Sequence, residues 1–498
     1  MTRDVETDTP ELPAAMASPP AAVLRPLEFL LDPAAAALIG RLPGLVRTAP
    51  SRPAALVWHD DQDGTLAAQG FALMRDGQTW SMQAIEPGAA YDWPPCSPPP
   101  PLGEGAVADL SPTPPFDAAP VAGFAGRRAV YADEVVQVTV LHGTLRGLFD
   151  DRPACRVDLT GPAPALMQWI DRLAECRAAV PRASLAAEAL AAAKGRRLPA
   201  RHLGAPSVTG DTALSDGLAR IVGHLLDTLL YWADEFRRER RPEPVHQARV
   251  AIRRLRSALS LYRRALPAPE LAELAASLRA CAARLGEARD WDVFLAETGA
   301  QLAAMAANDG RIGALLRGAE RQRQAAYVAL DAYLDGPEFR RIELRLGAAA
   351  SLRPWERDAV ADAIGLPTAD FAAVALTRRL RHVRRRGRRL DTLPVAELHE
   401  MRKDCKRLRY AAEFFAPSFP DSKDVRPFVK RLSALQEQLG LLNDAAVAGH
   451  LMGQLGRLGR GFAGGVVEGW AAAACIPARG RIEQSWRRFK DVSPFWTR

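Results

Sequence analysis

The sequence predicts two domains of different class: an α+β domain made mostly of antiparallel strands, then an all-α domain of helical bundles. The chain has 498 residues, which is too long for one compact core. Short strand-like segments fill the first 200 residues, whereas from about Leu214 onward apolar residues recur with a helical period of 3.6. The charge divides at the same place. Residues 1–200 carry 17 basic and 23 acidic side chains (net −6), and residues 201–498 carry 49 and 35 (net +14).

The first domain is expected to span residues 25–200, after a leader at 1–24 that we expect to be disordered because it is rich in Pro, Ala and Thr. Turn signals such as Asp63-Gly64 separate segments with strand character. These are Leu27–Leu31, Ala55–His59, Phe71–Met74, Thr79–Ile85, Val135–His142 and Cys155–Leu159. Residues 94–120 contain ten prolines, which predicts an exposed loop with polyproline character. Helices are expected at Ala163–Ala178 and Ser184–Lys194.

The second domain is expected to span residues 210–498 and to consist of helices only. Prolines and glycines such as Pro267, Gly286 and Pro394 are interpreted as helix breakers. The predicted helices are 214–240, 245–266, 270–285, 289–306, 310–333, 369–390, 395–416, 425–440 and 442–458, with shorter ones to the C-terminus.

An internal repeat indicates that this helical domain arose by duplication. VHQARVAIRRLRSALSLY (Val245–Tyr262) matches LHEMRKDCKRLRYAAEFF (Leu398–Phe415) at an offset of 153. Further along, LGEARD (Leu285–Asp290) matches LGLLND (Leu439–Asp444) at an offset of 154. Two ordered matches at nearly one offset are not expected by chance.

The repeated helix presents a cationic face. An α-helix advances about 100° per residue, so His246, Arg249, Arg253 and Arg256 fall within a sector about 100° wide, while apolar residues occupy the opposite side. The second copy places His399, Arg402, Lys406 and Arg409 on the same sector. Four further cations of the two helices are candidate rim residues of this face: Arg254, Arg263, Lys403 and Arg407.

A solvated charged face is the simplest interpretation of such a helix. The cationic stripe, however, lacks the interleaved Glu and Asp partners of a solubilising face. Arg249, Arg253 and Arg256 are instead like-charged neighbours, each pair destabilising the helix by roughly 0.2–0.5 kcal/mol. Because the same arrangement occurs in both copies, we favour an anion-binding surface where the two copies face each other.

The number of cations suits a long polyanion, because guanidinium groups bind phosphate oxygens with two hydrogen bonds. Nucleic acid and inorganic polyphosphate both qualify. A nucleic-acid site should also offer aromatic rings for base stacking, but Tyr262 falls on the apolar side and Tyr410 has no aromatic counterpart in the first copy. The pattern therefore favours a phosphate chain without bases.

Two further features leave alternatives open. His246 and His399 open their helices, so each could cap or pack the helix start, or add charge beside phosphate as the pH falls. Neither has Cys, Asp or Glu at ligand spacing, so no metal is expected. The run Thr377–Leu390 holds eight arginines and His382; it is interpreted as a rim of the same site, a nucleic-acid patch or a solvated helix end.

The repeated segments resemble the CHAD family, the conserved histidine α-helical domain, over residues 210–498. VHQARVAIRRLRSAL, LGEARDWDVF, LHEMRKDCKRLRYAAEFF and LQEQLGLLNDAAVA carry the resemblance. It implies two pseudo-symmetric four-helix bundles around a basic groove, binding of inorganic polyphosphate, and association with polyphosphate granules. The residues implied to bind polyphosphate are His246, Arg249, Arg253, Arg256, His399, Arg402, Lys406 and Arg409.

The first domain is similar to the CYTH family, a triphosphate tunnel fold. LEFLLDPAAAALIGRLPGL and VWHDDQDGTLAAQGFALMRDGQTWSMQA carry this resemblance. The family opens with alternating glutamates and a lysine for metal and phosphate, whereas here Glu28 is followed by Leu30 and Asp32. We therefore expect a degenerate domain without catalysis. The competing hypothesis is a metal-dependent triphosphatase whose metal site would be formed by Glu28, Asp60, Asp61 and Asp63.

The remaining composition predicts a cytoplasmic protein without a cofactor. Six cysteines lie far apart with no CxxC pair, which suits a reducing compartment. The acidic N-terminus does not read as a secretory signal, and no apolar run approaches the roughly 20 residues that span a bilayer. Polyphosphate is the expected partner, with no membrane and nucleic acid disfavoured.

Overall fold

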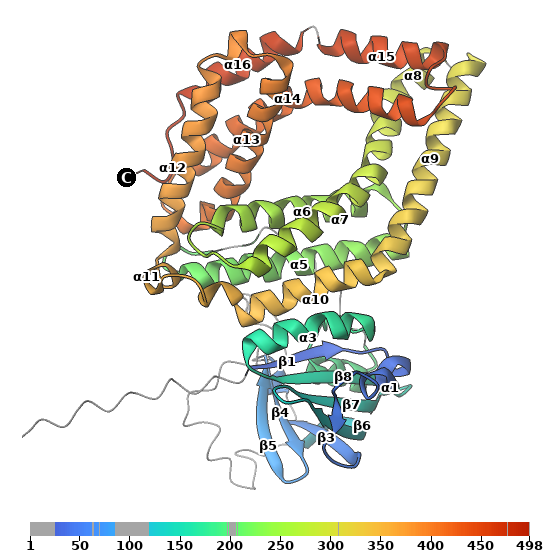
Figure 1. Ribbon diagram of the computed structural model, residues 1–498, viewed down its shortest axis with the longest axis vertical. Helices are drawn as coiled ribbons and strands as arrows, with labels where there is room; N and C mark the ends of the chain where they lie inside the picture. Colours follow the sequence, from blue (N-terminus) through green and yellow to red (C-terminus); the bar gives the residue numbers. More distant parts are fainter. Residues whose placement is uncertain are drawn as a thin grey trace, which may run out of the picture.

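The computed structural model describes residues 25–61, 64–68, 70–84, 119–196, 198, 206, 208–306, 308–475 and 477–497. A curled antiparallel sheet and its helices form the first domain, and long helices form the second (Figure 1). The predicted fold class is therefore confirmed. The leader at 1–24 and almost all of the proline tract lie outside the described residues.

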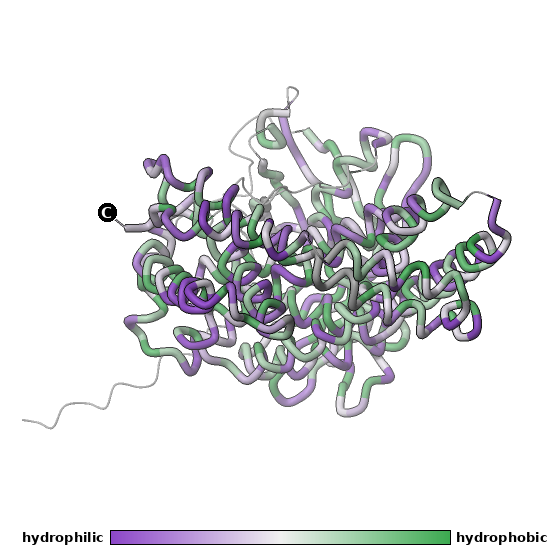
Figure 2. Tube along the Cα trace, turned by 90° about the horizontal axis from the view of Figure 1, so that it is seen from above, coloured by the Kyte–Doolittle hydropathy of each residue, from purple (hydrophilic) through white to green (hydrophobic). Residues whose placement is uncertain are grey.

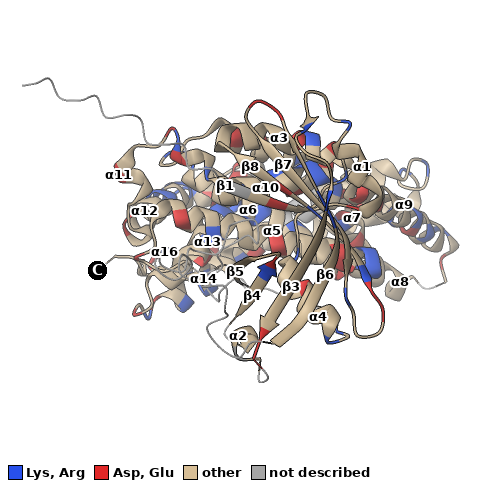
Figure 3. Ribbon diagram, turned by 90° about the horizontal axis from the view of Figure 1, so that it is seen from below, with Lys and Arg blue, Asp and Glu red and all other residues tan. Residues whose placement is uncertain are grey.

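The sheet of the first domain has the strand order β1-β8-β7-β6-β3-β4-β5, with β2 paired to β6, and it curls into a half-barrel. Every pairing is antiparallel. Most of the strand ribbon is uncharged (Figure 3). The strands are β1 Arg25–Leu30, β2 Val46–Arg47, β3 Arg52–Asp60, β4 Phe71–Asp76, β5 Thr79–Ala84, β6 Ala119–Ala132, β7 Gln137–Leu145 and β8 Arg152–Gly161.

Helices cover both faces of the sheet, because strand residues alternate between the two sides. α3 (Ala163–Glu175) packs on the face that carries Phe29 and Val157. α4 (Leu185–Ala193) packs on the other face, against Trp58 and Phe124. Two short helices, α1 Ala36–Ile39 and α2 Thr65–Ala68, lie in the connections.

The sequence analysis missed β6, although this 14-residue strand lies between β7 and β3. Its alanines and glycines give no clear alternation of apolar and polar residues. Its close pairing with β7 requires the glycines: a Cβ at Gly126 would overlap the carbonyl of His142. Strand pairing across the sheet therefore formed an element that local composition does not indicate.

In the second domain the helices trace a frame (Figure 1), with α6, α7, α13 and α14 along its inner edge. Hydrophobic and hydrophilic positions interleave along the helical part of the chain (Figure 2), as expected for amphipathic helices. The helices are α5 Leu214–Arg238, α6 Pro242–Tyr262, α7 Pro269–Phe294, α8 Ala300–Met305, α9 Gly310–Asp335, α10 Pro337–Leu352, α11 Ala361–Ile364, α12 Thr368–Gly387, α13 Val395–Phe415, α14 Val425–Gln454, α15 Phe462–Cys475 and α16 Ala478–Lys490.

The predicted breaks at Gly286 and between residues 440 and 442 are wrong. α7 runs without interruption through Gly286 and passes by a π-turn, Leu295–Gly299, into α8. α14 likewise continues through Gly440 to Gln454. The prediction also missed α10, a buried helix that packs against α5 and α3. Glycine lowers helix propensity by only about 1 kcal/mol, which tertiary packing can offset.

Contacts between α3 and α10 join the two domains. Asp171 of α3 accepts hydrogen bonds from the guanidinium of Arg345, at 2.7 and 3.0 Å, and lies 3.3 Å from Arg341. The buried Glu343 accepts a hydrogen bond from the backbone N–H of Val180 at 2.9 Å. One hydrophobic core runs through this contact, from the sheet to the long helices.

Candidate functional site

The two repeated helices converge toward their C-terminal ends. The rings of Tyr262 on α6 and Phe415 on α13, at equivalent positions of the repeat, are 6.2 Å apart. Before them, Arg253 donates a hydrogen bond to the hydroxyl of Tyr410 at 3.0 Å, and Arg254 donates one to Glu413 at 2.6 Å. α6 and α13 therefore form a V whose closed end is apolar. The cations of the repeat lie along its arms.

We call Arg249, Arg253, Arg402 and Lys406 the cationic wedge. The lowered pKa of Lys406 shows that these cations lie within electrostatic range of one another. Burial and the positive charges of Arg402, Arg253, Arg249 and Arg409 lower the pKa of its ammonium to about 7. Two of those arginines come from the other arm of the V. The structure thus brings together cations that lie about 150 residues apart in the sequence.

The glycines at the predicted helix breaks lie next to the guanidinium groups of two wedge arginines. The Arg249 guanidinium lies over Gly286 on α7, where an added Cβ would be 2.5 Å from Nη1. In the second copy the nearest atoms to such a Cβ at Gly440 are Nε and Nη2 of Arg402, at 3.8 Å. The glycine of the Leu-Gly pair in each repeat therefore has no side chain on the helix surface. Its absence leaves room for the arginine of the neighbouring helix.

The wedge cations differ in the negative charge near them. Arg249 donates a long hydrogen bond of 3.4 Å to the carbonyl of Ala282 and lies 3.9 Å from Asp290. Burial is the main cause that lowers the pKa of Arg249, and Arg253 and Arg289 lower it further, while Asp290 opposes them. Within the described part of the chain, no carboxylate lies within ion-pair distance of Arg253 or Lys406.

Other cations of the predicted set have carboxylate partners. Glu413 pairs with Arg409 at 3.2 Å as well as with Arg254, and Arg409 also donates to Gln436 at 2.9 Å. Lys403 and Arg407, predicted as rim residues, each pair with a carboxylate one turn earlier on α13. Lys403 lies 2.7 Å from Glu400, and Arg407 lies 3.1 Å from Asp404. The predicted lack of Glu and Asp partners therefore applies to α6 but not to α13.

The remaining predicted residues lie at the two ends of the V. Burial and nearby cations lower the pKa of both imidazoles, with Arg289 acting on His246 and Lys403 on His399. Both shifts favour the neutral form of the imidazole. Arg263 is the C-cap of α6 and is exposed. Arg256 faces α7 and α13, where burial and the charges of Arg279 and Arg407 lower its pKa.

The arginine run Thr377–Leu390 only partly adjoins this site. Arg379 lies near Arg407, and burial together with that charge lowers its pKa to about 10. Arg386 instead pairs with Asp404 at 2.9 Å, and Arg384 donates to backbone carbonyls near the C-terminus. The run is therefore divided between the rim and the outer side of its bundle.

Sequence reasoning missed two contributors to the site. Arg289 acts electrostatically on His246 and Arg249, and it stands inside LGEARD, so the second match of the repeat was the signal that could have identified it. The hydroxyl of Tyr410 accepts from Arg253, although its ring is only 4% exposed. No local pattern indicates that contact.

In the first domain, two of the four carboxylates proposed for a metal, Glu28 and Asp60, are engaged elsewhere. Glu28 accepts a hydrogen bond at 3.0 Å from the buried Arg156, which also pairs with Glu188 at 2.7 Å. Asp60 accepts the backbone N–H groups of Leu66 and Ala67 at 3.0 Å each, at the start of α2. Asp63 lies outside the described residues. Over the part of the chain that the structure describes, no group of three His, Cys, Asp or Glu side chains is placed to hold a metal.

No helix among the described residues combines the length and apolar character needed to cross a bilayer.

The fold and the wedge define a duplicated helical-bundle protein with a cationic site between its copies. The CHAD domain family matches residues 220–453. A solved structure, the crystal structure of the CHAD domain from the plant Ricinus communis, is similar at 31% identity and a TM-score of 0.50, covering 58% of this chain and 96% of that one. The chain belongs to the CHAD domain family.

A second solved structure, PptA from Streptomyces chartreusis, shares 19% identity and a TM-score of 0.44 over 55% of this chain and all of that one (100%). No curated protein matches the chain. The first domain is a curled antiparallel half-barrel with β1 and β5 at the two ends of its strand order, whereas the CYTH resemblance implies a tunnel.

Proposed function

We propose that this protein binds inorganic polyphosphate in the cationic wedge between α6 and α13. The observation that carries the proposal is the convergence of Arg249, Arg253, Arg402 and Lys406 in a partly buried space, where no described carboxylate lies within ion-pair distance of Arg253 or Lys406. Such an arrangement raises the energy of the free protein, and a chain of phosphate groups would relieve it. Guanidinium groups suit this role because each can give a phosphate two hydrogen bonds.

A ligand without bases is favoured over nucleic acid. Tyr262 is fully buried and packs against Phe371 and Phe415, so its ring cannot stack on a base. Tyr410 is also buried, and only its hydroxyl reaches Arg253. The wedge residues that the structure describes therefore offer charge but no open aromatic face, whereas single-stranded nucleic acid is usually held by both.

The experiment that tests this function is a binding titration of the full chain with polyphosphate over a range of salt concentrations. Affinity should fall steeply with salt because binding releases counterions. RNA at equal phosphate concentration and equal salt should not displace polyphosphate. Displacement by RNA would refute the preference for a base-free chain, and absence of polyphosphate binding would refute the function.

Association with polyphosphate granules is the cellular extension of this proposal. A fluorescent fusion of the full chain should collect at granules in cells that store polyphosphate. It should become diffuse when the wedge cations are removed. Granule association that is independent of the wedge would argue against this extension.

The two glycines beside the wedge arginines offer a matched test of the wedge geometry. Gly286→Ala places a methyl group 2.5 Å from Nη1 of Arg249, so the guanidinium must move and polyphosphate affinity should fall about tenfold, the loss of about one contact. Gly440→Ala meets Arg402 only at ordinary contact distance and should leave affinity unchanged. Both variants should gain up to about 1 kcal/mol in helix propensity, and thermal unfolding measures that gain. Equal affinities of the two variants would argue against Arg249 as a ligand.

We also propose that the first domain is not a metal-dependent triphosphatase. Glu28 is engaged with Arg156, and Asp60 with backbone N–H groups of α2. Incubating the full chain with a triphosphate substrate and Mg²⁺ or Mn²⁺ should release no phosphate above background. Robust turnover that is lost on Glu28→Gln would overturn this assignment.

A further inference from the structure

Cations that the wedge does not use gather around α16, on the outer side of the second bundle. A cavity of about 430 Å³ opens between α14 and α16. Its walls consist of four cations with three small or apolar residues, namely Arg426, Lys430, Arg431, Arg488, Ser485, Pro427 and Ala434. None of the described residues that line it is acidic.

This cavity is separate from the wedge although it shares α14 with it. Gln436, the partner of Arg409, and Gly440, which faces Arg402, mark the side of α14 that adjoins the site. The positions of α14 that line the cavity centre about 130° around the helix from those two residues. α14 therefore adjoins the wedge with one side and lines the cavity with Arg426, Lys430 and Arg431 on another.

The cations of this cavity lack a counter-charge in the structure. Among the described residues, no carboxylate forms an ion pair with Arg426, Lys430, Arg431 or Arg488. Arg426 and Lys430 are like-charged neighbours at i, i+4 on α14, an arrangement that disfavours the free helix. Arg431 donates only a long bond, 3.3 Å, to the carbonyl of Arg488.

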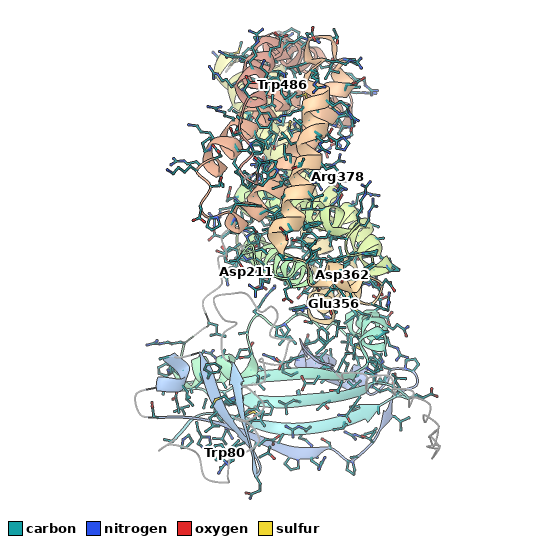
Figure 4. All side chains as sticks on the ribbon, turned by 90° about the vertical axis from the view of Figure 1, so that its left-hand side faces the viewer. Trp80, Asp211, Glu356, Asp362, Arg378 and Trp486 are labelled. Atoms are coloured by element: carbon teal, nitrogen blue, oxygen red, sulfur yellow. The ribbon has the colours of Figure 1, made fainter. Side chains whose placement is uncertain are left out.

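A second cavity, of about 770 Å³, lies on the other flank of α16, between it and α12. Arg384, Arg388 and Lys490 line it, together with Asp491. The two arginines belong to the run Thr377–Leu390, most of which the wedge leaves unused. α12, α14 and α16 meet in one part of the frame (Figure 1), and Trp486 of α16 lies at the end of the molecule far from the sheet residue Trp80 (Figure 4).

We propose that these flanks of α16 form a second phosphate-binding surface, here called the outer basic face, which holds another segment of a polyanion without bases. The face consists of six cations: Arg384, Arg388, Arg426, Lys430, Arg488 and Lys490. This inference rests on the proposed function, because it takes the ligand class from the wedge. Trp486 does not supply a stacking surface, since it is only 9% exposed and its indole is packed on Gly387.

The physical consequence is that the affinity for polyphosphate depends on the length of the phosphate chain. A short phosphate chain can occupy only one of the two sites, whereas a long chain can occupy both. The second contact is then intramolecular and raises the apparent affinity through effective concentration. The outer basic face therefore selects long chains over short ones.

The test compares three variants of the full chain. The outer variant is Arg426→Ala/Lys430→Ala/Arg488→Ala, and the control Arg284→Ala/Arg317→Ala/Arg321→Ala removes the same charge from α7 and α9; all six side chains are exposed. The wedge variant changes Arg249, Arg253, Arg402 and Lys406 to Ala. The probes are tripolyphosphate and a polyphosphate of about 100 units, long enough for bivalent contact.

The outer variant should bind tripolyphosphate as the native chain does. It should bind the long chain about ten- to a hundredfold more weakly, with the salt slope lower by about three. The control should match the native chain. The wedge variant should keep weak long-chain binding that disappears when the outer changes are added.

Several results would overturn the inference. One is native long-chain affinity of the outer variant, and another is a loss by the control equal to that of the outer variant. Displacement of the wedge variant's residual polyphosphate by RNA at equal phosphate would identify the face as a nucleic-acid surface instead. Failure of the proposed function is distinguishable, because it would leave the wedge variant with native binding of both probes.

Discussion

Changing Arg249, Arg253, Arg402 and Lys406 together to alanine is expected to lower the affinity for long-chain polyphosphate about a thousandfold. A cation beside an array of phosphates contributes about 1 kcal/mol, and about 4 kcal/mol corresponds to nearly three powers of ten in the dissociation constant. Fluorescence titration with end-labelled polyphosphate at near-physiological salt measures the change. The salt slope should fall by about one for each cation removed.

The same variant should stay folded, because its cations repel one another in the free protein. The charges of Arg402, Arg253 and Arg249 all act to lower the pKa of Lys406. Helicity by circular dichroism should be unchanged, and the melting temperature should not fall by more than the loss of side-chain packing explains. The control variant removes four exposed arginines from other faces, namely Arg238, Arg284, Arg317 and Arg321. Equal loss of binding in that control would show that net charge, not the wedge, holds the ligand.

Polyphosphate affinity is expected to fall as the pH rises through neutrality. The pKa of Lys406 is about 7 in the free protein, so its ammonium loses its proton above that pH. A bound polyanion favours the charged form, and each pH unit above the free pKa then weakens binding by a factor of ten while the bound form keeps its proton. Between pH 6.0 and 8.5 the affinity should fall by about 30-fold. Titrations at constant ionic strength measure it.

Lys406→Arg is the matched control for this pH dependence. Arginine keeps its charge throughout the range, so this variant should bind with little change between pH 6.0 and 8.5 and more tightly than the native chain at the upper end. Lys406→Met should also lose the dependence but bind weakly at every pH. A dependence that survives in Lys406→Arg would show that another group is responsible.

The stability of the free protein should change with pH in the opposite direction. Because the pKa of Lys406 is lowered in the folded state, the unfolded chain binds more protons between pH 7 and the usual lysine range. The free energy of unfolding therefore gains a contribution from this group as the pH rises through 7. Rising stability together with falling affinity is a combination that a general effect of pH on folding would not produce.

The helical domain was largely predictable because its signals are local. Apolar periodicity placed α5, α6, α9, α12 and α13 within a few residues of their observed bounds. The predicted breaks failed at Gly286 and Gly440 because a glycine that ends a helix and one that admits a neighbouring side chain look alike in sequence. The strand β6 was not predicted for a related reason, because its glycines allow close strand pairing and do not mark a turn.

By itself, the sequence determined the duplication, the helical class of the second domain and the sector of each repeated helix that bears cations, because these follow from spacing along one element. Only the tertiary structure decided which cations meet. It placed Arg253 beside Tyr410 and Lys406 within electrostatic range of Arg249, and it paired both Arg254 and Arg409 with Glu413. The physical reason is that electrostatic and steric interactions depend on distance in space, and the angle at which α6 and α13 converge is set by contacts between distant segments of the chain.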